Sequence, residues 1–69
     1  MSSKREEVAA FKRLRKAFPD VNCALECWYT SWYKELRYYC TVPSVGSTIG
    51  NCTPNVNEAV DLMIKMKGE

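Results

Sequence analysis

The sequence has no histidine, and this absence narrows the chemistry that the chain could perform. Histidine is the commonest general base and the usual partner of a serine or cysteine nucleophile. The eight Asp and Glu residues are scattered, and no two are placed as an acid and base pair. Glycine is scarce, and Gly46 and Gly50 lack the lysine and hydroxyl residue of a phosphate-binding loop. We therefore expect a non-enzymatic protein with no cofactor and no small-molecule substrate.

Long apolar runs are also missing, so the sequence contains no candidate for a membrane-spanning segment. No apolar run follows the first charged residues, which argues against a secretory signal. We expect a cytoplasmic protein without a membrane partner, in which cysteines stay reduced. An even count of four cysteines also leaves open two disulfides in a processed, secreted chain. The four are Cys23, Cys27, Cys40 and Cys52.

The cysteine spacing does not fit a structural metal site. Cys23 and Cys27 are close in sequence, but eleven residues separate Cys40 from Cys52, so the second tight pair of a zinc knuckle is missing. We therefore expect no bound metal. The sequence instead favours Cys27 and Cys40 as small buried residues of the core.

What is present indicates a single small domain over residues 1–69, with residues 1–2 disordered. Residues 3–17 are predicted to form an amphipathic helix, because Ser3 and Glu6 have the spacing of a capping box. Its apolar stripe recurs every three or four residues and consists of Val8, Phe11, Leu14 and Phe18.

Residues 23–42 are rich in aromatic and β-branched residues and are predicted to form a β-hairpin. A register in which paired residue numbers sum to 67 sets three residues of one apolar face against three others, namely Leu25, Cys27 and Tyr29 against Val42, Cys40 and Tyr38. The expected turn near Ser31–Glu35 contains no Gly, Asn or Pro. A helix over 24–39, with a stripe of Leu25, Trp28, Trp32 and Leu36, therefore remains an alternative.

The last third of the chain is predicted to contain a loop and a second helix. Residues 43–53 read as a loop or short strand, with Thr48 and Ile49 as candidates for a third strand. Residues 54–67 have the pattern of a helix that begins near Asn55 and ends before Gly68. The predicted fold is a small α+β two-layer sandwich, with both helices on one face of an antiparallel sheet.

Aromatic residues are the most distinctive feature of the composition, because six lie between positions 28 and 39. A chain this short cannot bury all of them. Strand alternation predicts that Trp28 and Tyr39 lie beside Arg37 on the uncovered sheet face, with Trp32 and Tyr33 at the turn. Such a patch either packs against loops or binds a partner, and we expect it to bind a partner protein or a second copy of the chain.

The charge is unevenly distributed, although the net charge is only +2. Six of the ten cations lie in residues 1–17, and the basic side of the predicted helix consists of Arg5, Lys12, Arg13 and Lys16. A basic helix is either a solvated face or a contact surface for an acidic partner or nucleic acid.

The order helix, strands, helix, with a Gly- and Thr-containing turn before the last helix, resembles the double-stranded RNA-binding fold in topology. That family has a lysine cluster at the start of its last helix, whereas residues 53–58 contain no cation. The resemblance therefore implies a topology and transfers no site residue.

Two functional hypotheses follow. The first is a protein-binding accessory or inhibitor protein of phage or mobile-element type, which acts through the aromatic patch. The second is a nucleic-acid-binding domain that uses the basic helix, with aromatic stacking in support.

Overall fold

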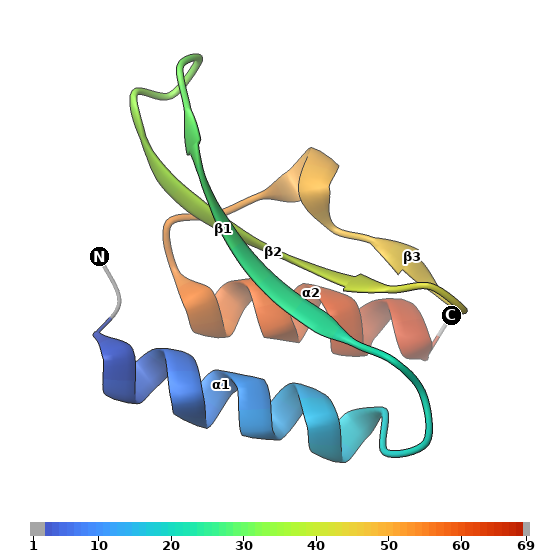
Figure 1. Ribbon diagram of the computed structural model, residues 1–69. Helices are drawn as coiled ribbons and strands as arrows, with labels where there is room; N and C mark the ends of the chain where they lie inside the picture. The colour runs from blue at the N-terminus through green and yellow to red at the C-terminus, as the bar shows by residue number, and fades with distance from the viewer. Residues whose placement is uncertain (1–2, 69) are drawn as a thin grey trace.

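A computed structural model describes residues 3–68, and it confirms the small α+β sandwich, with a β-hairpin in place of the alternative helix (Figure 1). The disorder expected for residues 1–2 lies outside the described residues. The elements are α1 (Lys4–Ala17), β1 (Ala24–Thr30), β2 (Glu35–Val42), β3 (Gly46–Ser47), the short 3-10 helix η1 (Ile49–Asn51) and α2 (Val56–Lys67). Both helices lie on the same face of the sheet.

Each α-helix begins at a side-chain cap of the kind that the sequence indicates. The Ser3 hydroxyl accepts a hydrogen bond from the Glu6 backbone N–H at 3.2 Å. The Asn55 side chain accepts from the backbone N–H groups of Asn57 and Glu58. These bonds satisfy amide groups that have no acceptor within the helix. Neither helix within residues 3–68 is long and apolar enough to cross a membrane.

The sheet is antiparallel with the strand order β1-β2-β3, so β1 is an edge strand. Its register corrects our prediction by two residues, because Leu25 pairs with Cys40 and Cys27 pairs with Tyr38. The reason is a tight four-residue turn over 31–34, in which the Lys34 N–H donates to the Thr30 carbonyl at 2.7 Å. A shift of two residues keeps every side chain on its predicted face.

The turn forms without glycine because Lys34 adopts a positive φ of 56°. The Thr30 hydroxyl also accepts a hydrogen bond from the Tyr33 N–H at 3.2 Å. The left-handed backbone costs a non-glycine residue about 1 kcal/mol. Strand pairing on both sides of the turn offsets that cost. The turn therefore forms without the Gly, Asn or Pro residues from which a hairpin turn is usually predicted.

The third strand lies two residues earlier than predicted, because Gly46 and Ser47 pair with β2 in place of Thr48 and Ile49. Gly46 has a φ of 139°, a conformation that L side chains rarely adopt. Thr48 is buried instead, and its hydroxyl accepts a hydrogen bond from the Cys40 N–H at 2.8 Å.

The core lies between the two helices and β2, with α2 packed against β2 and α1 packed beside α2. Its buried members are Ala10, Leu14, Phe18, Tyr38, Cys40, Val42, Val56, Ala59, Val60 and Met63. Burying these side chains supplies the main hydrophobic stabilisation of the fold.

Three residues predicted for the core are exposed: Val8, Cys27 and Tyr29. Cys27 and Tyr29 do lie on the helix-facing side of β1, as strand alternation requires. The turn end of the hairpin extends beyond the helices, so nothing covers that part of the sheet (Figure 1). Cys40 is completely buried, as predicted.

Candidate functional site

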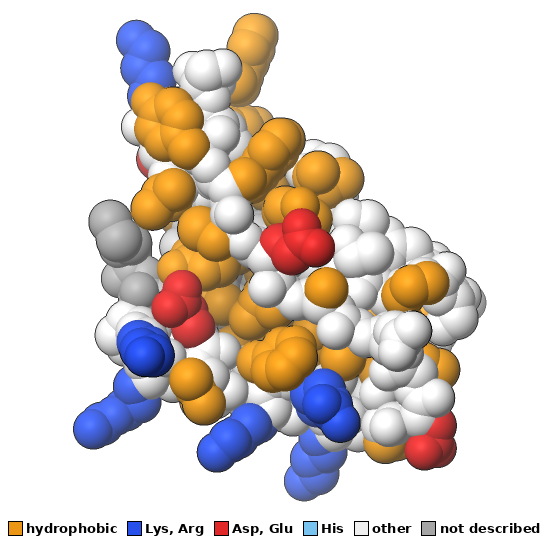
Figure 2. Space-filling view, in the orientation of Figure 1, with side chains coloured by type: hydrophobic (Ala, Val, Ile, Leu, Met, Phe, Trp, Pro, Cys, Tyr) orange, Lys and Arg blue, Asp and Glu red, His pale blue; other side chains and the backbone are white. Residues whose placement is uncertain are grey.

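The turn end of the hairpin carries the most exposed aromatic surface of the described chain. The exposed fractions are 42% for Trp28, 87% for Trp32 and 51% for Tyr33. Hydrophobic side chains project at this end in the space-filling view (Figure 2). We call these three residues the aromatic tip. Exposed Trp and Tyr side chains bury large areas on binding at a low cost in rotamer entropy.

Trp28 and Tyr39 lie together on the sheet face opposite the helices, as predicted. Their ring centroids are 5.9 Å apart and the ring planes are inclined at 75°, an edge-to-face contact. The Tyr39 hydroxyl donates a hydrogen bond to the Glu26 carboxylate, and this bond is the main cause of the raised pKa of Tyr39. Tyr39 is half-buried, so it positions Trp28 more than it offers surface of its own.

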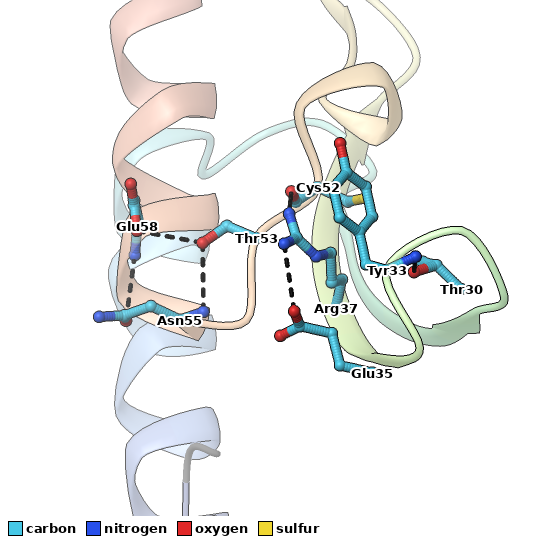
Figure 3. Close-up of polar contacts among 8 residues, drawn as sticks. All are labelled: Thr30, Tyr33, Glu35, Arg37, Cys52, Thr53, Asn55 and Glu58. Atoms are coloured by element: carbon cyan, nitrogen blue, oxygen red, sulfur yellow. Dashed lines mark hydrogen bonds and ion pairs between the residues drawn. The ribbon is translucent and has the colours of Figure 1, made fainter.

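Arg37 is held by contacts inside the molecule (Figure 3). Its guanidinium lies 3.5 Å from the centroid of the Tyr33 ring, donates to the Cys52 carbonyl at 3.0 Å, and pairs with Glu35 at 3.2 Å. Only 18% of its side chain is exposed. Arg37 therefore fixes Tyr33 and joins the turn end of the hairpin to the loop before α2.

The loop before α2 is itself pinned to the sheet. The Tyr38 N–H donates to the Thr53 carbonyl at 2.7 Å, and the Thr53 N–H returns a bond at 3.0 Å. The Thr53 hydroxyl also lies 3.0 Å from the Glu58 carboxylate (Figure 3). The aromatic tip is consequently mounted on a braced base, although its outermost residue, Trp32, projects freely.

The cations on the basic face of α1 differ in their contacts. Arg13 donates to the Asn57 side chain at 3.0 Å and forms an ion pair with Asp61, so it ties α1 to α2. The other α1 cations are exposed, and no ion pair joins them to any carboxylate within residues 3–68. They are Lys4, Arg5, Lys12, Arg15 and Lys16. The sequence predicted Arg13 as part of this surface because its partner Asp61 is distant in the sequence, and only the tertiary structure brings the two side chains together.

The cysteines are free thiols in the structure, and they differ in burial. Cys40 lies in the core, where burial raises its pKa to about 11. Burial and the charge of Glu7 also raise the pKa of Cys27. Across residues 3–68, no three His, Cys, Asp or Glu side chains gather as a metal-binding group.

Comparison of the chain with protein-family models, with curated proteins and with solved structures found no match.

Proposed function

We propose that this chain is a small, non-enzymatic protein-binding module that contacts its partner through the aromatic tip. The single observation that carries the proposal is the exposure of Trp28, Trp32 and Tyr33 at one end of a braced hairpin. Large exposed aromatic side chains on a fixed base are typical of binding hot spots. Arg37 stacks on the Tyr33 ring and Tyr39 packs edge-to-face against Trp28, so both residues hold the aromatic tip in place. An accessory or inhibitor protein of phage or mobile-element type would suit a domain of this size.

The test is a pull-down from the lysate of the cell that encodes the chain, with nuclease present and at two salt concentrations. The bait proteins are the wild type, Trp28→Ala, Trp32→Ala and the control Ile49→Ala. Ile49 has about the same exposure as Trp28, at 41%, but lies in η1. We expect a discrete protein that the wild type and the control retain and that both tryptophan variants lose. Equal recovery by all four baits would contradict the proposal.

The tryptophan variants need a check on folding. Trp32 makes no ring contact within the described chain, so Trp32→Ala should leave the free energy of unfolding within about 0.5 kcal/mol of the wild type. Trp28→Ala loses the Tyr39 contact, worth about 1 kcal/mol. Unfolding of Trp32→Ala would show that this side chain is structural.

The second candidate is nucleic-acid binding through the exposed cations of α1, and it rests on their lack of ion pairs within residues 3–68. Lys12, Arg5 and Lys16 remain available for phosphate contacts, whereas Arg13 is engaged by Asp61. This function predicts that affinity for double-stranded RNA or DNA falls steeply with salt, because each neutralised phosphate releases counterions. A binding constant that does not change with salt would exclude it.

A further inference from the structure

The outer edge of the sheet offers unpaired backbone groups at regular intervals along β1. The β2 residues Tyr38 and Cys40 direct their N–H and C=O groups away from β1, toward Thr53 and Thr48. Alternation in an antiparallel ladder then assigns the β1–β2 hydrogen bonds to Trp28 and the other even-numbered residues of β1. The backbone groups of Leu25, Cys27 and Tyr29 therefore point outward.

The side chains of the same three residues face the helix side of the sheet, where an open groove separates β1 from α1. The groove has a volume of about 490 Å³ and is mostly apolar. Its floor consists of Val8, Phe11, Leu25, Cys27 and Tyr38. Figure 2 shows this band of hydrophobic side chains between the cations of α1 and the hairpin. Val8 and Cys27, expected in the core, are exposed because they line it.

Two lysines and two carboxylates line the groove, and the two kinds of side chain differ in their contacts. Lys4 and Lys12 line its α1 rim and have no acidic partner within the described part of the chain. The two carboxylates that line it are both engaged, Glu7 by the Tyr38 hydroxyl at 2.8 Å and Glu26 by the Tyr39 hydroxyl. The groove thus combines an apolar floor, two lysines on the α1 rim without an ion pair among residues 3–68, and a row of free backbone groups.

We propose that this groove binds an extended acidic segment of a partner protein by strand addition to β1. Backbone hydrogen bonds to Leu25, Cys27 and Tyr29 would pair the added strand with the sheet edge. Alternate apolar side chains of the segment fill the groove, and Asp or Glu side chains meet Lys4 and Lys12.

The two lysines without an ion pair in the described chain, Lys4 and Lys12, favour an acidic segment over a second copy of the chain. Two copies joined at β1 by a two-fold axis would have their helices on the same face of the combined sheet. That arrangement brings two α1 helices toward each other across the axis, with their unpaired lysines on the approaching sides. The lysines of the two copies would repel each other, whereas the Asp or Glu side chains of an acidic segment would neutralise them.

The groove lies on the opposite sheet face from Trp28 and Tyr39, so the proposal does not depend on the aromatic tip. The two can be tested separately, because Trp32→Ala should leave the groove intact.

The probe is a displayed library of ten-residue peptides in which apolar residues alternate with randomised positions. We expect selection against the wild-type protein to enrich Asp and Glu at the randomised positions. A synthetic copy of an enriched peptide should slow amide exchange at Leu25, Cys27 and Tyr29, measured by NMR, without a comparable change at Trp28. N-methylation of every second peptide residue removes alternate N–H groups. Methylation of the residues that pair with β1 should abolish binding, whereas methylation of the intervening residues should not, because a strand pairs with its neighbour through one set of its amide groups.

A pair of double variants tests the cationic rim at equal net charge. Lys4→Glu with Lys12→Glu should weaken the affinity for the selected peptide about tenfold or more. Lys16→Glu with Lys65→Glu makes the same change in net charge away from the groove and should alter affinity less than about twofold. Equal losses in the two variants would overturn the proposed position of the acidic side chains.

Three results would overturn the proposal. The library could yield no binder, or binders without acidic residues. The free protein could sediment as a dimer with protected amides at Leu25, Cys27 and Tyr29, which would identify a second copy as the occupant. A duplex RNA probe could displace the selected peptide with a steep salt dependence, which would assign the α1 rim to nucleic acid instead.

Discussion

The β-hairpin is buried at one end and exposed to solvent at its turn end, although both ends belong to the same two strands. On the helix-facing side of β2, Cys40 and Val42 are completely buried. On the same side, nearer the turn, Leu36 is 40% exposed and its β1 partner Tyr29 is 61% exposed. Strand alternation places all four side chains on one face.

The difference teaches that alternation decides the face of a side chain, and the neighbouring layer decides its burial. The helices end before the turn end of the hairpin, so the same apolar pattern gives a core at one end and a free surface at the other (Figure 1). An apolar surface that the fold leaves uncovered is where a partner gains most from binding.

The largest expected effect comes from one substitution made in both regions. Leu14→Ala leaves a cavity in the core and should lower the free energy of unfolding by about 3 kcal/mol. Leu36→Ala removes the same atoms from the turn end and should cost less than about 1 kcal/mol, because Leu36 is already partly exposed. Urea denaturation followed by circular dichroism measures both values. Equal losses would show that the turn end is as well packed as the core.

Alkaline pH should lower the free energy of unfolding, because it ionises two side chains at the buried end of the hairpin. Burial and the hydrogen bond to Glu7 raise the pKa of Tyr38 from 10.0 to about 12. Burial raises the pKa of Cys40 from 9.0 to about 11. Both groups are neutral in the folded protein and ionise earlier in the unfolded chain. Their contribution to stability is therefore complete below pH 9 and is lost as the pH rises to 12.

The matching variant is Tyr38→Phe, which removes one of these titrating groups. It should lose less stability than the wild type between pH 10 and pH 12, measured by urea denaturation across that range. Parallel pH profiles of the two proteins would contradict the assignment to Tyr38.

The smallest expected effect concerns the link between the two regions. Arg37→Met keeps an apolar stem but removes the contacts to Tyr33, Glu35 and Cys52, and should cost about 1.5 kcal/mol. The control Arg15→Met changes an exposed cation with no ion pair within residues 3–68 and should stay within about 0.5 kcal/mol. Amide exchange at Tyr33 and Glu35 should also quicken in Arg37→Met. An unchanged exchange rate would show that Arg37 does not brace the turn.

Much of the fold follows from local patterns in the sequence. The caps at Ser3 and Asn55, the helical periodicity of residues 3–17 and the aromatic strands predict the element order, and the structure contains these elements in that order. These signals are readable because each depends on residues three or four positions apart, or on simple alternation.

The register of the hairpin was not predictable from the same signals. Its turn contains no glycine and instead uses Lys34 at a positive φ with hydrogen bonds to Thr30. Both the predicted and the observed register place the same side chains on the same faces, so the apolar pattern could not distinguish them.

The candidate sites were only partly predictable. Exposed Trp28 and Trp32 follow from alternation and from position at the turn. The roles of Arg37 and Arg13 depend on partners far along the chain, Cys52 and Asp61, which no local pattern brings near. The groove beside β1 gave no sequence signal at all, because Val8 and Cys27 have the spacing of ordinary core residues.

The sequence alone determined which elements form and which face of each is apolar, since both depend on local backbone preference and on side-chain periodicity. Only the tertiary structure decided which apolar residues are covered. Burial depends on how far α1 and α2 reach beneath the sheet, and helix length and packing leave the turn end of the hairpin and the β1 edge open.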